Sequence, residues 1–324
     1  MNIVFFGTPY FAAYHLEQLI ECAYNIVAVV TTPDTQQGRG RKIHPSPVKK
    51  IALSHNLTVL QPDKMQDKTF IKNLRSLKPN LFIIVAFRKL PEYIWKIAGK
   101  GTINLHTSLL PAYRGAAPIN RVIMNGETHT GVSTFYINDK IDTGDILLQK
   151  KILLSNQITA GELHNKLMES GALLLLKTLN ELNNISPVKQ GISQSLKIAY
   201  KIQKQDLRIN WNSPIENIYN LIRGLSPLIN KEKYLEDVAI CPSAWCIYNN
   251  GHTERRLKIN NSEIIKESSG NKFLSLYTDN KEYLHINLKE GRLAIINVQL
   301  EGKKAMNIKQ FLAGNKINTL CSIS

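Results

Sequence analysis

The apolar run Leu81–Phe87 is the feature that most constrains the fold of this chain. Seven apolar residues without alternation are typical of a parallel strand that is covered on both faces. The apolar segment Asn2–Phe6 and the β-branched segment Ile26–Thr31 predict two further strands, and the apolar stripe of Phe11–Glu21 predicts a helix between them. Repeated strand–helix–strand order favours an α/β fold with an open, mostly parallel, doubly wound sheet.

The amino-acid composition of the chain changes after a long predicted helix at Thr159–Leu182. The segment that follows is basic and rich in Asn, Ser, Gln and Lys, which is typical of a linker. Beyond it, short alternating segments are separated by turn signals, which predicts a smaller, β-barrel-like C-terminal domain. We therefore expect an α/β domain at residues 1–185, a basic linker at residues 186–208 and a β-rich domain at residues 209–324.

The composition limits the partners and the compartment. Lys and Arg number 41 and Asp and Glu 25, a formal net charge of +16, which indicates either a polyanionic partner such as nucleic acid or a compositional bias. The four cysteines fit neither a disulfide framework nor a zinc pattern, so we expect reduced thiols and no metal. With no charged leader and no apolar run near the roughly 20 residues of a membrane helix, we expect a cytoplasmic protein without a membrane partner.

Polar residues at a predicted strand end form the main candidate for chemistry. Asn104 and His106 are two apart at the carboxyl end of the strand Gly101–Leu105, so their side chains point to the same side, at the edge where α/β sheets bind ligands. Asp142 precedes a tight turn. A histidine can carry a proton, a carboxylate can orient it, and an Asn amide can donate to an oxyanion. Turn and cap roles are the alternative for all three residues.

Missing motifs narrow the reaction. The sequence contains no Gly-x-Ser-x-Gly elbow and no evident nucleophile, which favours direct transfer between two bound substrates. Neither a Gly-x-Gly-x-x-Gly nor a Walker A motif follows the first strand, which argues against a dinucleotide or P-loop domain.

Two basic segments are candidates for contact with a phosphate backbone. The segment Gly38–Lys50 carries five Lys and Arg residues and no acid, and its glycines would let the arginines adapt to phosphates. Lys303 and Lys304 form a second basic pair near the C-terminus. An ordinary solvated surface is the alternative for both.

Several motifs together resemble the methionyl-tRNA formyltransferase family. The likeness extends from about Asn2 to Met306, and its most specific part is the run Ile103–Ile119. Further matching segments are Phe6–Ala12, Pro45–Lys49, Asp142–Asp145 and Gly302–Met306.

The resemblance implies an enzyme of translation initiation and one-carbon metabolism. Its reaction would transfer a formyl group from the co-substrate 10-formyltetrahydrofolate to the α-amino group of methionyl initiator tRNA. Asn104, His106 and Asp142 would be the catalytic trio, and Arg39 would contact the acceptor end of the tRNA. To Arg39 we add, from their charge, Arg41, Lys42, Lys303 and Lys304. The folate site would be lined by Ser108, Leu109, Leu110 and Pro111, together with Ala86 and Phe87. We expect a monomer.

Two departures from the family pattern leave alternatives open. The loop Ala86–Pro91 is one residue short and lacks a glycine, and residues 228–240 are additional. A formyltransferase of the same fold acting on a small amine, such as an amino-sugar nucleotide, would use the same trio. A non-enzymatic RNA-binding protein and a hydrolase of formylfolate are the other two alternatives.

Overall fold

The computed structural model describes residues 1–37, 42–191, 196–229, 233–235, 241–266 and 272–324. Its internal contacts divide the chain into two compact units. The first consists of Met1–Gly115, His129–Ile152 and Lys166–Ile198, and the second of Ala116–Thr128, Leu153–Asn165 and Ala199–Ser324. The boundaries expected at residues 185 and 208 stay a prediction. None of the described helices is both long and apolar enough to cross a membrane.

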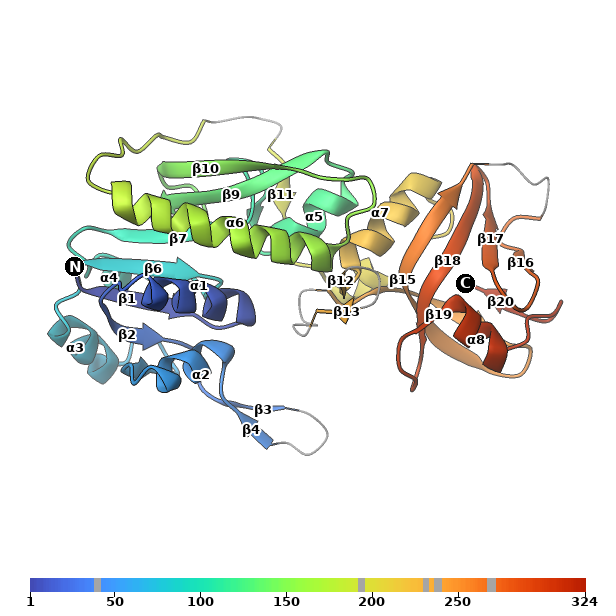
Figure 1. Ribbon diagram of the computed structural model, residues 1–324, viewed down its shortest axis with the longest axis horizontal. Helices are drawn as coiled ribbons and strands as arrows, with labels where there is room; N and C mark the ends of the chain where they lie inside the picture. The colour runs from blue at the N-terminus through green and yellow to red at the C-terminus, as the bar shows by residue number, and fades with distance from the viewer. Residues whose placement is uncertain (38–41, 192–195, 230–232, 236–240, 267–271) are drawn as a thin grey trace. The chain divides into compact units, whose positions relative to one another are not determined.

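The first unit is built on a seven-stranded sheet in the order β10-β9-β7-β6-β1-β2-β5 (Figure 1). The strands β5, β2, β1, β6 and β7 all run parallel to one another, and β9 is antiparallel to β7. The mostly parallel α/β sheet is therefore confirmed. The strands are β1 (Ile3–Gly7), β2 (Ile26–Val30), β5 (Val59–Leu60), β6 (Leu81–Val85), β7 (Thr102–His106), β9 (His129–Tyr136) and β10 (Ile146–Leu153).

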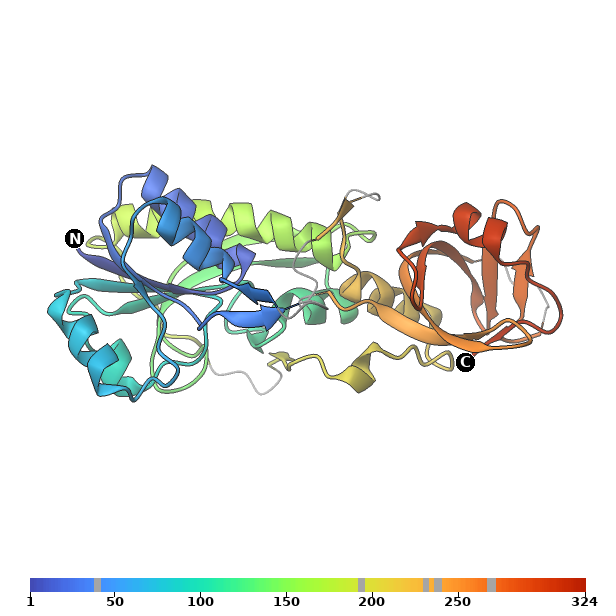
Figure 2. The same cartoon turned by 90° about the horizontal axis from the view of Figure 1, so that it is seen from below.

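Helices cover both faces of this sheet. Figures 1 and 2 show α1 (Tyr10–Glu21) and α6 (Ala160–Glu181) on one face, and α3 (Lys68–Ser76) and α4 (Glu92–Trp95) on the other. All five residues of β6 are buried, as the apolar run predicts for a central strand. Phe6 and Phe82 of the sheet pack with Phe70 of α3 and Ile94 of α4 in one apolar cluster. The sheet is thereby fixed as a rigid base for the loops at its carboxyl edge.

Local signals set where these elements begin and end. Helix α2 (Pro47–Ser54) starts after Ser46, whose hydroxyl accepts a hydrogen bond from the Lys49 N–H at 3.0 Å. The apolar run Leu81–Phe87 predicted a longer strand than is found. Strand β6 ends at Val85 because Ala86 takes a left-handed conformation, with φ of +47°, and turns the chain out of the sheet. The short strands β3 (Thr35–Gln37) and β4 (Lys42–His44) pair as an antiparallel hairpin.

The second unit contains a seven-stranded antiparallel sheet that curls into a barrel-like form, which confirms the β-barrel-like C-terminal part. Its order is β16-β17-β18-β15-β14-β20, and β19 pairs with β18. The fully buried Phe311 packs in its core with residues such as Ile259 and Leu293. The strands are β14 (Ala244–Asn249), β15 (Glu254–Ile265), β16 (Leu276–Thr278), β17 (Leu284–Leu288), β18 (Gly291–Leu300), β19 (Met306–Asn307) and β20 (Ser322–Ile323).

The second unit also holds helices, of which the one at Ile308–Gly314 was not predicted from the sequence. Helix α8 (Ile308–Gly314) starts at a capping box, in which Asn307 accepts from the Gln310 N–H and Gln310 accepts from the Asn307 N–H. Two further helices, α5 (Pro118–Met124) and α7 (Ile215–Leu225), are joined by a 2.8 Å hydrogen bond from the Asn120 amide to the Gly224 carbonyl. The remaining elements are η1 (Lys204–Leu207), β8 (Arg114–Gly115), β11 (Ile198–Ala199), β12 (Leu228–Ile229) and β13 (Lys233–Tyr234), of which the last two pair with each other.

Burial gives the cysteines different reactivities. Cys246 on β14 is fully buried, and this burial raises the pKa of its thiol to about 12, whereas Cys22 is exposed. Because the thiolate is the nucleophile, we expect a disulfide reagent at pH 8 to label Cys22 within minutes and Cys246 only after unfolding. Mass spectrometry of peptides from native and denatured protein measures this difference. Equal labelling of both thiols in the native protein would contradict the packing of β14.

Candidate functional site

Strand β7 carries two of the candidate residues to the carboxyl edge of the sheet. Asn104 lies between Ile84 of β6 and Phe135 of β9, and His106, the last residue of β7, lies opposite Ser133 of β9. His106 is buried, with 7% of its surface exposed, and Asn104 is half-buried. The spacing of two residues in a strand places both on one side of β7, as the sequence predicted.

The surroundings of His106 fix where its ring carries a proton. The Nε2 atom lies 2.8 Å from the backbone oxygen of Tyr113. A carbonyl oxygen can only accept, so Nε2 carries a hydrogen in both the neutral and the charged ring. Proton exchange is therefore left to Nδ1, which lies 3.8 Å from Oδ2 of Asp142.

Asp142 reaches His106 from the connection between β9 and β10. Its Oδ2 accepts a hydrogen bond from the Gly115 N–H at 2.9 Å, and its side chain is 14% exposed. The backbone of Asp142 is left-handed, with φ of +54°, a conformation that Asp tolerates better than most residues. The structure thus brings together His106 and Asp142, which are far apart in the sequence.

The segment Ser108–Pro111 is held by hydrogen bonds that the sequence did not reveal. The Ser133 hydroxyl donates to the Ser108 carbonyl at 2.6 Å and accepts from the Leu110 N–H at 3.1 Å. The amide of Gln149 donates to the Leu110 carbonyl at 2.9 Å and to the Ser133 hydroxyl at 2.8 Å. Ser108 itself is buried and donates to the Ala112 carbonyl at 2.7 Å, and the Leu110–Pro111 peptide is cis. In the sequence, the polar residues Ser133 and Gln149 within two predicted strands were the signal from which these contacts could have been expected.

The loop after β6, which the resemblance predicts to be one residue short, is held by Arg88. Its guanidinium donates to the backbone oxygens of Pro62 at 2.5 Å and Asp63 at 3.2 Å, and lies 5.7 Å from the centre of the Phe87 ring. The Phe87 ring in turn contacts Phe6 edge-on, 5.7 Å between centres. Arg88 therefore fastens the loop to the segment that follows β5.

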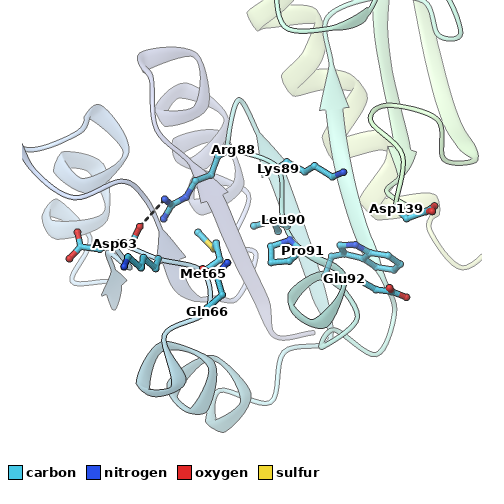
Figure 3. A pocket seen from close by; sticks show the side chains of 11 residues that line it. Asp63, Met65, Gln66, Arg88, Lys89, Leu90, Pro91, Glu92 and Asp139 are labelled. Carbon is cyan, nitrogen blue, oxygen red and sulfur yellow. Dashed lines mark hydrogen bonds between the residues drawn. The ribbon is translucent and has the colours of Figure 1, made fainter.

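A pocket of about 610 Å³ lies against this loop (Figure 3). This volume is within the range of sites for small molecules and cofactors. One wall comes from the segment after β5, a second from the loop after β6 with α4, and Asp139 lies at the edge on the β9–β10 connection. The lining combines apolar side chains with both charges: Asp63, Lys64, Met65, Gln66, Arg88, Lys89, Leu90, Pro91, Glu92, Trp95 and Asp139.

The basic candidates are described only in part. Arg39 and Arg41 lie outside the described residues, and Lys42 is the first residue of β4. Lys303 and Lys304 are exposed after β18, at a turn in which Gly302 has φ of +76°.

Lys49, in the same basic segment of the sequence, makes polar contacts within the fold. Its ammonium lies 2.7 Å from both the Asp34 carboxylate and the Gln61 amide oxygen. Hydrogen bonds from Lys49 and Gln61 lower the pKa of Asp34. Among the described residues, no group of three or more His, Cys, Asp or Glu side chains gathers as metal ligands.

Known folds and sequences match both parts of the chain. The Formyl transferase family model matches residues 1–179, and the model of the Formyl transferase C-terminal domain matches residues 201–316. Among solved structures, a sugar 3N-formyl transferase, WlaRD, is similar with a TM-score of 0.62 and 18% identity, covering 94% of this chain and 99% of that one. The methionyl-tRNA formyltransferase from Clostridium thermocellum has a TM-score of 0.54 and 18% identity, covering 82% of this chain and 94% of that one.

Some sequence relatives share much higher identity with this chain than these two solved structures do. The methionyl-tRNA formyltransferase of Flavobacterium johnsoniae is 41% identical over 97% of this chain and 96% of its own length. That of Bacteroides thetaiotaomicron is 40% identical over 98% of this chain and 97% of its own length. With near-complete coverage on both sides, this chain belongs to the methionyl-tRNA formyltransferase family.

Proposed function

We propose that this chain transfers a formyl group from 10-formyltetrahydrofolate to the α-amino group of methionyl initiator tRNA. The observation that carries the proposal is the His106–Asp142 pair at the carboxyl edge of the sheet, in a chain about 40% identical to methionyl-tRNA formyltransferases over nearly its whole length. Such an enzyme would work in the cytoplasm, where aminoacyl-tRNA is made, and we expect a monomer.

His106 and its neighbours suit the proton transfers of this reaction. An α-amino group has a pKa near 8, so a useful fraction is already neutral at pH 7 and can attack the formyl carbon. As the new bond forms and the bond from the formyl carbon to the folate nitrogen breaks, the attacking nitrogen must lose a proton and the leaving nitrogen must gain one, and Nδ1 of His106 is the atom that can take the proton and return it. Asp142 then stabilises the charged ring. The Asn104 amide would donate to the oxygen on which negative charge develops.

The pocket beside Arg88 supports a site for the folate. The folate supplies the formyl group when it is bound. Its flat ring system requires an apolar slot with polar groups at the edge, and the side chains of Met65, Leu90 and Trp95 beside charged neighbours provide that chemistry. The similar fold of WlaRD was solved in the presence of 5-N-formyl-THF.

The loops around this pocket would position the folate rather than react with it. Ser108, Leu109, Leu110 and Pro111 do not line the pocket, and they would bind a part of the folate that extends beyond it, held in place by hydrogen bonds to Ser133 and Gln149. Ala86 and Phe87 precede the lining residue Arg88 in the same loop and would contact the folate next to the pocket.

The positive charge of the chain supports tRNA as the second substrate. Exposed Lys303 and Lys304 would contact phosphates, and so would Arg39, Arg41 and Lys42 of the basic segment. Contacts of this kind set affinity and orientation rather than base identity.

The deciding experiment measures labelled formyl transfer to initiator and to elongator methionyl-tRNA. We expect rapid labelling of the initiator tRNA, weaker labelling of the elongator tRNA, and affinity for tRNA that falls steeply with salt. Parallel reactions contain an amino-sugar nucleotide or no acceptor at all. Label on the amino sugar but not on tRNA would contradict the proposal. So would formate release without an acceptor at the rate of transfer, and so would tRNA binding without transfer.

A further inference from the structure

Gln190, in the segment after α6, has both ends of its side-chain amide engaged. The nitrogen Nε2 donates to the backbone oxygens of Asp142 at 3.0 Å and Gly144 at 2.7 Å. The oxygen Oε1 accepts from Nε and Nη2 of Arg114 at 3.0 and 2.6 Å. The residue is half-buried and belongs to the first unit with all of these partners. One side chain therefore joins the turn that carries Asp142 to the segment around Arg114.

The segment around Arg114 is the one that holds the His106–Asp142 pair. Tyr113 binds Nε2 of His106 through its carbonyl, and Gly115 donates its N–H to the carboxylate of Asp142. Arg114 lies between them in the chain and binds Gln190. Three consecutive residues thus contact the ring, the glutamine and the carboxylate, and Gln190 completes the connection by binding the backbone of the Asp142 turn.

The backbone around both partners makes such a restraint useful. Asp142 is left-handed, which costs free energy for any residue except glycine, so the turn persists only where its surroundings hold it. The segment of Gln190 is itself anchored, because Val188 and Ile146 exchange two backbone hydrogen bonds of 2.8 Å. Gln190 therefore approaches the turn from a segment that is fixed to the start of β10.

We propose that Gln190 is a positioning residue for formyl transfer: it holds the Asp142–Gly144 turn so that the Asp142 carboxylate stays at Nδ1 of His106. Only an amide of this length meets both needs, since it offers two N–H donors to two carbonyls and one oxygen to the Arg114 fork. Glutamate keeps the shape and the contact with Arg114 but turns acceptor oxygens toward the carbonyls of Asp142 and Gly144. Because these groups repel, the turn is pushed away while the rest of the fold is unchanged.

The test compares Gln190→Glu with Gln157→Glu, the same chemical change at an exposed position. We expect Gln190→Glu to lower kcat about tenfold, as a mispositioned catalytic group does, with KM for both substrates within about twofold and an unchanged denaturation midpoint. The control should behave as wild type. In an Asp142→Asn background the glutamine change should cost little more, because the residue acts through that carboxylate. A full tenfold loss in that background would overturn the proposal.

A second measurement is independent of catalysis, because the proposal rests on the proposed function. Proton–nitrogen NMR of the imidazole rings, with His106 assigned by its loss in His106→Asn, reports the environment of Nδ1 directly. We expect Gln190→Glu to shift the His106 signals and Gln157→Glu to leave them in place. Unshifted signals would overturn the positioning role even if the chain formylated another acceptor. Inactive wild-type protein with shifted signals would instead count against the function alone.

Discussion

Replacing His106 with alanine should lower kcat for formyl transfer by about 10²–10⁴, the usual contribution of a general acid–base residue. The reason lies in the two ring nitrogens. Nε2 is committed to the Tyr113 carbonyl, so Nδ1 is the atom available to take the proton that the attacking amine must lose. Without it, the proton passes to water, which is a much weaker base and is not held in place.

The measurement should separate chemistry from binding. Single-turnover transfer with saturating protein gives the chemical step, and a filter-binding titration gives the affinity for methionyl-tRNA. We expect the first to fall and the second to change by less than about threefold, because a buried ring contributes little to phosphate contacts. His252→Ala, in an exposed turn of the second unit, is the matched control. Turnover near that of wild type for His106→Ala would remove this histidine from the mechanism.

The parts of the fold that local pattern determines were predictable from the sequence. The continuous apolarity of Leu81–Phe87 predicted the central strand, and the apolar stripe of Phe11–Glu21 predicted α1. A strand that is buried on both faces is apolar throughout, and a helix that is buried on one face carries an apolar stripe. Helix α8 was within reach too, since Asn307 and Gln310 form a capping box ahead of apolar residues. We did not predict this helix, because the residues around it were interpreted as short strands. The end of β6 was not readable, because an alanine at positive φ has no sequence signature.

The candidate site was predictable only where it lies on one element. Asn104 and His106 share β7, so their spacing placed them together at a strand end. Asp142 was grouped with them on its chemistry and by the resemblance to a known family, but no local pattern placed it beside them, because it arrives from a turn whose course the sequence does not encode. The supporting residues were out of reach for the same reason: Gln190 bonds to Arg114 76 positions away, and Ser133 bonds to Ser108 25 positions away. Hydrogen bonds over such separations follow from topology rather than from periodicity.

Gly144→Ala should lower kcat about a hundredfold, although it adds only a methyl group to a residue that touches no reacting atom. An added Cβ would lie 1.6 Å from the backbone oxygen of Tyr136, far closer than two non-bonded atoms can approach. Tyr136 is a strand residue whose N–H is bonded to the Asp145 carbonyl at 2.9 Å, so the strand cannot give way easily. The turn must move instead, and Asp142 moves with it.

Gly99→Ala is the matched control, because an added Cβ there meets no atom within 4 Å. We expect that variant to keep wild-type kcat and stability. Urea denaturation of both variants separates a displaced turn from global unfolding, since the first leaves a single cooperative transition with its slope unchanged. Wild-type kcat for Gly144→Ala would show that the turn can shift without carrying Asp142 away from His106.

The double variant Asp142→Asn/Gly144→Ala shows whether the methyl group acts through the carboxylate. If the displaced turn lowers kcat by withdrawing Asp142, then removing the charge first leaves little for the methyl group to do, and the two losses are far from multiplicative. If the losses multiply, the turn must contribute through another group, such as the Gly144 carbonyl, which accepts from Gln190 at 2.7 Å. The cycle therefore assigns the cost of one methyl group either to the carboxylate at Nδ1 of His106 or to the backbone that holds the turn.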